Sequence, residues 1–251
     1  MITLNKLRKK IVELVYKSGE GHIPSSFSIV DIIYFIYKYR LNKKDYFILS
    51  KGHGALALYV VLNHFKIISS KILNLYYKNN LLIGGHPEIN LNGVFASTGS
   101  LGHGFPAAVG ITLGLKIKKK LNDKVFCLIG DGECNEGSIW ESANIAANLN
   151  LNNLICLLDD NKSSKNLLPI DNLNLKWKAF GWNVINSNGH SIKSMTNAFK
   201  KLDKLKNNKP TIVIFSTIKG KGVKFMENNG KWHHKVPSPL ELKNINKILT
   251  K

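Results

Sequence analysis

Two continuously apolar runs in the middle of the chain predict buried β-strands, "KVFCLI" at residues 124–129 and "NLICLLDDN" at 153–161. Such runs are typical of strands that helices cover on both faces. The segment between them, "GSIWESANIAANLN" at 137–150, has the length and the spacing of a helix. Strand, helix and strand in this order form a βαβ unit, so we expect the two strands to be parallel.

The rest of the chain alternates between helical and strand-like patterns in the same way. The expected elements are helices at 4–17, 28–39, 55–65, 70–78 and 107–120, strands at 45–50 and 210–218, a helix followed by a strand at 176–185, and a loop at 84–93. No repeat or low-complexity linker divides the sequence. We therefore predict one domain over residues 1–251, of α/β class, with a mostly parallel sheet and helices on both faces.

The formal charge of +20 raises the question of a nucleic-acid partner. Of the 36 basic residues only Arg8 and Arg40 are arginine, which leaves 34 lysines. Recognition of bases and phosphates depends largely on the bidentate guanidinium of arginine, and the lysines are scattered over the polar faces of the expected helices. Lys, Asn and Ile share A/T-rich codons, so genome composition accounts for the charge. We expect no specific nucleic-acid partner.

The location of the protein is constrained by its cysteines and its N-terminus. The three cysteines form no evenly spaced set, so a disulfide framework is not expected and a reducing compartment is favoured. Charges interrupt the N-terminal segment every few positions, and no stretch is apolar enough to cross a bilayer. These features predict a cytoplasmic protein without a membrane partner.

A carboxylate and an amide follow the two central strands. Asp131 stands between Gly130 and Gly132 directly after the first strand, and Asn161 ends the second. Ligands of parallel α/β sheets gather beyond the carboxyl ends of the strands, and oxygen ligands of this type suit Mg²⁺. The two glycines would let the backbone bend sharply and approach a phosphate. On its own, "GDG" is more typical of a tight turn, and Asn161 is what favours the metal interpretation.

The spacing "GDGECNEG…LLDDN" resembles the thiamine diphosphate signature, in which the Asp and the Asn hold the magnesium that binds the cofactor's diphosphate. Further stretches occur in the order found in transketolases: "GHIPSSFS", "LSKGHGALALY", "GGHPE", "STGSLGHG", "KWKAFGW" and "KGKGVKFMENNGKWHHKVP". The chain looks most like the separate N-terminal subunit of split bacterial transketolases, and the resemblance runs from about Lys6 to Pro237. It implies a thiamine diphosphate-binding fold, specifically the diphosphate-binding domain.

The resemblance also assigns roles to individual residues. It implies that Asp131 and Asn161 bind Mg²⁺, with the backbone carbonyl of Ser163 as a weaker match, and that His53 contacts the diphosphate. Further contacts to the cofactor are implied for Gly99, Leu101, Gly132 and His233. His22, His86 and His233 would line the channel for a ketose phosphate, where imidazoles suit proton transfer near neutral pH.

Several of these residues also have an ordinary explanation. Each histidine alone is more often a loop residue, and Leu101 could simply pack in a core. Glu136 resembles the acidic residue that links cofactor sites across the interface between subunits, but a glutamate at a helix N-terminus is also favoured by the helix dipole. His64 and His190 are interpreted as structural. His103 replaces the Gln of many transketolases, and His234 replaces a usual Gly.

One segment departs from the family pattern. After Asn161 the usual "IDG" turn is missing and "SSKNLLPIDNLNL" is several residues shorter than its counterparts, so cofactor affinity could be weaker. The pyrimidine-binding domain, which supplies the activating glutamate in this family, is not recognisable in this chain. The expected activity is transfer of a two-carbon ketol unit between sugar phosphates in the pentose phosphate pathway. It is expected only together with a C-terminal subunit, in a two-plus-two heterotetramer.

Two alternatives remain open at this point. The stretch "GSLGHG" also occurs in deoxyxylulose phosphate synthases, so the chain could be half of such an enzyme, although the C-terminal "WHH" region argues against it. The chain could also be a degenerate subunit that binds without catalysing. A degenerate subunit is not favoured, because the motif residues are all present: Asp131, Asn161, His53 and His233.

Overall fold

The computed structural model describes residues 2–78, 83–165 and 168–250. The chain divides into two compact units, which we call the sheet unit and the helical unit. The sheet unit comprises Leu41–Lys51 and Thr98–Ser216. The helical unit comprises Met1–Arg40, Gly52–Ser97 and Thr217–Lys251. Each unit is described by itself below.

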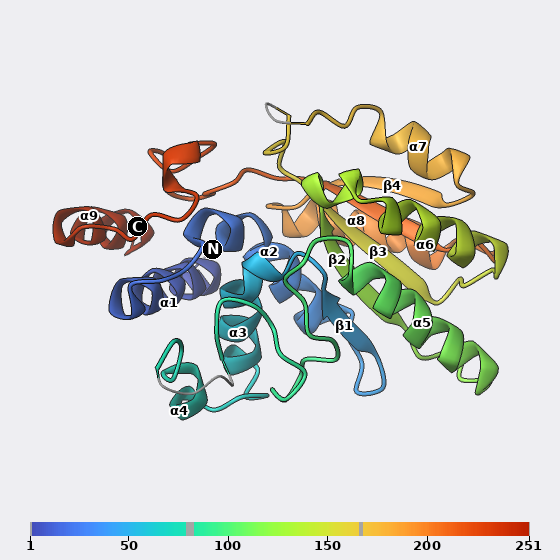
Figure 1. The fold of residues 1–251 in the computed structure, drawn as a ribbon, viewed down its shortest axis with the longest axis horizontal. Coiled ribbons are helices and arrows are strands. Elements are labelled where there is room, and N and C mark those ends of the chain that lie inside the picture. The colour runs from blue at the N-terminus through green and yellow to red at the C-terminus, as the bar shows by residue number, and fades with distance from the viewer. Residues whose placement is uncertain (1, 79–82, 166–167, 251) are drawn as a thin grey trace. The chain divides into compact units, whose positions relative to one another are not determined.

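The sheet unit contains a five-stranded parallel sheet with the strand order β1-β2-β3-β5-β4 (Figure 1). Its strands are β1 (Tyr46–Leu49), β2 (Val125–Gly130), β3 (Leu154–Asp160), β4 (Asn183–Asn188) and β5 (Thr211–Ser216). Every residue of β2 and β3 is buried, as expected for central strands that are covered on both faces. The predicted α/β class with a parallel sheet is confirmed.

Helices cover both faces of this sheet. They are α5 (Gly104–Ile117), α6 (Gly137–Asn148), α7 (Leu173–Ala179) and α8 (Ile192–Asp203). The crossover from β2 through α6 to β3 and the crossover from β4 through α8 to β5 run in opposite directions along the sheet. Right-handed crossovers therefore put α6 and α8 on opposite faces, and Figure 1 shows α8 passing behind the strands.

An aromatic cluster joins α5, α6 and α7 on one of these faces. The ring of Trp177 lies 5.3 Å from that of Trp140 and 5.8 Å from that of Phe105, measured between centroids. The indole of Trp182 lies 4.9 Å from Trp177 and donates a hydrogen bond to the carbonyl of Ala143 at 2.9 Å. The stretch "KWKAFGW" thus provides core packing beneath the helices.

The helical unit is built from α1 (Ile2–Ser18), α2 (Ile23–Tyr39), α3 (Ala55–His64), α4 (Ser70–Leu73) and α9 (Pro239–Thr250). Inside it, the buried guanidinium of Arg8 pairs with the carboxylate of Asp31 at 2.7 Å and donates a further hydrogen bond to the carbonyl of Lys221. Within the described ranges, no helix is both long enough and apolar enough to span a bilayer.

Two predicted helices have other bounds in the structure, and two observed helices were not among the predicted elements. Helix α2 begins at Ile23 rather than residue 28, because "IPSSFS" is buried and helical from its first residue. The helix expected over 70–78 ends at Leu73, and turns follow, with Tyr77 at a left-handed φ of 53°. Helices α8 and α9 were given no residue ranges in the prediction, although lysines of both segments were assigned to polar helix faces. The loop expected at 84–93 is confirmed.

Candidate functional site

The carboxyl ends of β2 and β3 lie side by side. Gly130 is the register partner of Asp159, and the amide of Asp131 donates a hydrogen bond to the carbonyl of Asp159 at 3.1 Å. Asp131 therefore follows one strand end and Asn161 follows its neighbour. The predicted arrangement of the two strands is confirmed, because the crossover through α6 makes them adjacent and parallel.

Asp131 is 4% exposed, and its carboxylate is held by the segment that follows Asn161. The amide and the hydroxyl of Ser164 donate to Oδ2 of Asp131, at 3.3 and 3.1 Å. Gly130 and Gly132 have no left-handed φ, and a Cβ at either would meet other atoms only at 3.6 Å or more. The chain turns here from β2 into a short 3-10 helix, Gly132–Asn135, without a left-handed residue, and the close approach to a phosphate stays a prediction.

The side-chain amide of Asn161 is held at both ends. Its Nδ2 donates to Oδ2 of Asp159 at 2.9 Å, and its Oδ1 accepts from the amide of Ser163 at 3.0 Å. The same Oδ2 of Asp159 pairs with Nζ of Lys51, at the end of β1, and both members of this pair are buried. Ser163 is exposed.

A pocket of about 100 Å³ opens at these strand ends and is lined by Asp131, Asp160, Lys162, Ser164, Lys165, Pro169, Ile170 and Asp171. Oδ2 of Asp160 pairs with Nζ of Lys162 at 2.8 Å. Its Oδ1 is buried and has no hydrogen-bond partner among the described residues. Burial raises the pKa of Asp160, Lys162 opposes the rise, and Asp131 adds to it.

These groups fit a hard cation. The carboxylate of Asp131 and the orphaned Oδ1 of Asp160 are oxygen donors that line this pocket, and Oδ1 of Asn161 is a further oxygen at the neighbouring strand end. Oxygens of this type are the ligands that Mg²⁺ prefers. Over the described ranges, no group of three or more His, Cys, Asp and Glu side chains is arranged as a metal site. The predicted set does not require such a group, since it contains one carboxylate, one amide and one backbone carbonyl.

Glu133 ties the ends of β1 and β2 to the loop at 98–103. It is 1% exposed, and its carboxylate accepts hydrogen bonds from the hydroxyl of Ser50 and from the amides of Gly102 at 2.9 Å and Gly130 at 3.2 Å. Burial raises its pKa, and these hydrogen bonds together with Lys51 oppose the rise. Glu133 was not among the predicted site residues, because a charged residue in "GDGE" is ordinarily expected at the surface.

The remaining predicted residues of the sheet unit lie at the same end. Gly99 and Leu101 are half-buried in the 98–103 loop, and Gly102 in that loop has a left-handed φ of 80°. Glu136 is exposed at the N-cap of α6, which agrees with a glutamate favoured there by the helix dipole. Its side chain makes no capping hydrogen bond. The interface role of Glu136 stays a prediction.

The helical unit gathers four histidine rings. The centroid of His22 lies 5.9 Å from that of His53, 5.2 Å from His233 and 4.6 Å from His234. Nε2 of His234 lies 3.4 Å from a carboxylate oxygen of Glu20. Nδ1 of His233 lies 3.1 Å from Nζ of Lys219.

The environment of His22 favours its neutral form. Burial, with His233, His234, His86 and Lys219 nearby, lowers the pKa of His22 to about 4. His86 is exposed, and its backbone carbonyl accepts a hydrogen bond from the hydroxyl of Tyr59 at 2.7 Å. The three channel histidines predicted from the resemblance thus belong to one electrostatic cluster.

The other histidines have local contacts. His64 ends α3 and packs its ring on Tyr34 and Phe65, which agrees with a structural role. His190 lies in a turn, where its backbone amide donates a hydrogen bond to Oδ1 of Asn188. His103 is exposed at the N-cap of α5, with Nδ1 at 3.1 Å from the carbonyl of Leu101.

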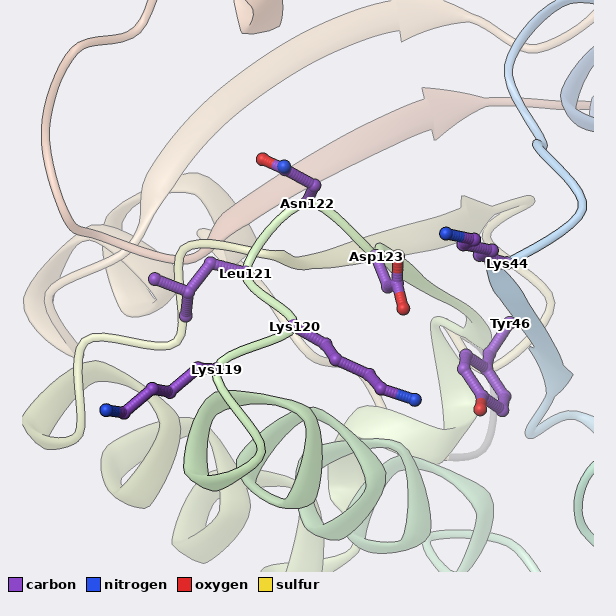
Figure 2. Close-up of a pocket in the computed structure, with 7 residues that line it drawn as sticks. All are labelled: Lys44, Tyr46, Lys119, Lys120, Leu121, Asn122 and Asp123. Carbon is purple, nitrogen blue, oxygen red and sulfur yellow. The ribbon is translucent and has the colours of Figure 1, made fainter.

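A larger pocket, of about 400 Å³, lies at the opposite end of the sheet (Figure 2). Its lining residues are Lys44, Tyr46, Lys119, Lys120, Leu121, Asn122 and Asp123. They precede β2 or flank the start of β1, whereas Asp131 follows the carboxyl end of β2. This pocket is therefore not part of the strand-end site.

Comparison with known proteins identifies the family of the chain. The family model described as "Transketolase, thiamine diphosphate binding domain" matches residues 2–251. An apulose-4-phosphate transketolase subunit of Phocaeicola vulgatus is 36% identical over 93% of this chain and 87% of its own length. The 6-deoxy-6-sulfo-D-fructose transketolase subunit of a Clostridium species is 34% identical over 92% of this chain and 88% of its own.

Solved structures agree in fold. The crystal structure of transketolase from Campylobacter jejuni superposes with a TM-score of 0.88 at 26% sequence identity, and the match covers 98% of this chain. The chain spans 42% of the length of that transketolase. The signature around Asp131, the parallel sheet and these matches agree, and the chain belongs to the transketolase N-terminal, thiamine diphosphate-binding family.

Proposed function

We propose that this chain is the diphosphate-binding subunit of a transketolase that moves a two-carbon ketol unit from a ketose phosphate to an aldose phosphate. The observation that carries the proposal is the placement of Asp131 and Asn161 at adjacent strand ends, with Asp131 lining a pocket there. The two relatives named as subunits support a partner chain, because each is about the length of this one.

Asp131 and Asn161 would hold Mg²⁺, with the carbonyl of Ser163 as a third ligand and Gly132 beside the diphosphate. When bound, thiamine diphosphate would supply a thiazolium ring that takes up the electron pair of the broken ketose carbon–carbon bond. Leu101 and Gly99 would face the cofactor from the 98–103 loop, which Glu133 fixes in place. His53 and His233 would contact the cofactor from the helical unit.

His22, His86 and His233 would bind the hydroxyl and carbonyl oxygens of the ketose. His22 has its pKa lowered to about 4, so it is neutral at physiological pH and can both donate and accept a hydrogen bond. A neutral imidazole can accept a proton from a sugar hydroxyl without first losing one to water. The exposed Glu136 would meet the second cofactor site across the interface of a two-plus-two assembly.

The donor sugar is not fixed by the family alone. One relative is named for apulose 4-phosphate and the other for 6-deoxy-6-sulfo-D-fructose, so the family accepts ketoses outside the pentose phosphate pathway. We propose xylulose 5-phosphate as the donor to try first, with these two ketoses as alternatives.

The test is a ketol-transfer assay with thiamine diphosphate and Mg²⁺, using ribose 5-phosphate as acceptor. The chain is assayed alone and with a candidate C-terminal chain. We expect activity only in the mixture and its loss in Asp131→Ala, whereas Asp45→Asn, at the opposite end of the sheet, should keep it. Activity of the chain alone would contradict the need for a partner. Condensation of pyruvate with glyceraldehyde 3-phosphate instead would indicate a deoxyxylulose phosphate synthase.

A further inference from the structure

A fully buried ion pair lies beneath the strand-end site. Lys51 is 2% exposed and Asp159 is 0% exposed, and they come from positions 108 residues apart in the chain. Burying two charges costs several kcal/mol per ion, and a well-packed apolar pair often stabilises a fold as much or more. Stability alone is therefore a weak reason for this pair, so a role in the neighbouring site has to be considered.

Asp159 also holds the side chain of Asn161. The Oδ2 atom that pairs with Lys51 accepts a hydrogen bond from Nδ2 of Asn161 at 2.9 Å. The two ends of an asparagine amide differ, since Nδ2 only donates and Oδ1 only accepts. With Nδ2 bound to Asp159, Oδ1 is turned away from the ion pair and accepts from the amide of Ser163 at 3.0 Å.

The charge of Asp159 matters for this orientation. An ionised carboxylate can only accept hydrogen bonds, so it binds Nδ2 of Asn161 and repels Oδ1. A neutral side chain at position 159 could donate a hydrogen bond to Oδ1 of Asn161, so it would also accommodate the Asn161 amide in the flipped orientation. The ammonium group of Lys51 contacts the same oxygen of Asp159, and both side chains are buried away from water.

We propose that Lys51 and Asp159 are a positioning pair that selects the amide orientation of Asn161 in which Oδ1 is available to a metal ion. The inference deepens the proposed function and rests on it, because only Oδ1 can bind Mg²⁺. Groups behind metal ligands commonly change metal affinity 10- to 100-fold when they are removed. Neither residue needs to contact the metal or the cofactor for this effect.

Binding of thiamine diphosphate in the presence of Mg²⁺, measured by calorimetry on the full chain, tests the inference. We expect Asp159→Asn to raise the Kd at least about 10-fold. Lys51→Met is a second variant, in case the first does not fold, and should act in the same direction. Asp45→Asn is the matched control. Asp45 is also buried and accepts two backbone hydrogen bonds at the other end of the sheet, so this variant should lose stability and keep the Kd.

The exchange variant Asp159→Asn/Asn161→Asp separates positioning from stability. Both oxygens of an aspartate at 161 can bind a metal, so orientation no longer matters, and we expect the Kd to return to within about threefold of wild type. The free energy of unfolding of the exchange variant should stay below that of wild type, because Lys51 has lost its charged partner at position 159.

Three results would overturn the inference. The first is an unchanged Kd in Asp159→Asn, which would fit Lys51 acting as a direct diphosphate ligand once it is released. The second is a Kd in the exchange variant as weak as in Asp159→Asn. The third is wild-type chain that binds no cofactor with or without Mg²⁺, which would contradict the proposed function itself.

Discussion

The carboxylate of Glu133 accepts a hydrogen bond from the backbone amide of Gly102 at 2.9 Å, inside a site with almost no access to water. The same carboxylate binds the hydroxyl of Ser50 and the amide of Gly130. These donors lie at the ends of β1 and β2 and in the 98–103 loop. One buried side chain therefore fixes the loop that is expected to face the cofactor against two strand ends.

Removal of this carboxylate should destabilise the chain. Glu133→Ala leaves three buried donors without an acceptor, each of which costs about 1–3 kcal/mol. We expect the free energy of unfolding in urea to fall by about 3 kcal/mol or more. The exposed Glu141 on α6 offers the control, since Glu141→Ala should change it by less than about 0.5 kcal/mol. Similar losses in both variants would show that the hydrogen bonds of Glu133 contribute nothing.

Two glycines of the sheet unit should respond to alanine with opposite signs. Gly102 has a φ of 80°, and a Cβ there would lie 2.5 Å from Oγ of Ser138 and 2.7 Å from Cβ of Glu136. We expect Gly102→Ala to lower the melting temperature. Gly114 lies inside α5 with nothing within 4 Å of an added Cβ, so Gly114→Ala should stabilise by about 0.5–1 kcal/mol. Thermal unfolding followed by circular dichroism measures both, and a neutral Gly102→Ala would contradict the close contact.

Stability should depend on pH through His22. The pKa of His22 is about 4 in the folded chain and near 6.5 when unfolded, so the unfolded state binds more protons between these values. The contribution of His22 is therefore fully present above about pH 6.5 and is lost as the pH falls toward about 4. His233, His234, His86 and Lys219 face the ring and favour its neutral form.

The measurement compares wild type with His22→Gln by urea unfolding at about pH 7 and about pH 5. Glutamine does not titrate, so the wild type should lose more stability than the variant between these two values. Equal losses in the two proteins would mean that the His22 ring titrates normally, in a cluster more open to water than its contacts indicate.

The fold could be predicted where one physical signal dominated. The strands β2 and β3 are continuously apolar, because helices cover both of their faces, and their place in the sequence was clear. Helix α8 was missed although its buried residues Met195, Ala198 and Phe199 follow the spacing of an amphipathic helix. Helix α4 ends at Leu73 because turns follow it, and the spacing of apolar residues does not predict such turns.

The site could be predicted only in part for a similar reason. Asp131 and Asn161 follow apolar strands directly, so their positions could be inferred from a single βαβ unit. Lys51, Glu133 and Asp159 have partners far along the chain, and a charged residue in a sequence is ordinarily assigned to the surface. The second Asp of "LLDDN", at the end of a buried strand, was the available signal that more than one carboxylate is enclosed there.

The central claim is that this chain binds the diphosphate of thiamine diphosphate through a metal held by Asp131. The most direct test is calorimetric binding of thiamine diphosphate to wild type and to Asp131→Ala, with Mg²⁺ and after its removal with EDTA. We predict binding that needs Mg²⁺ and that weakens at least about 10-fold in the variant. Equal binding by both proteins, or wild-type binding that survives EDTA, would contradict the account.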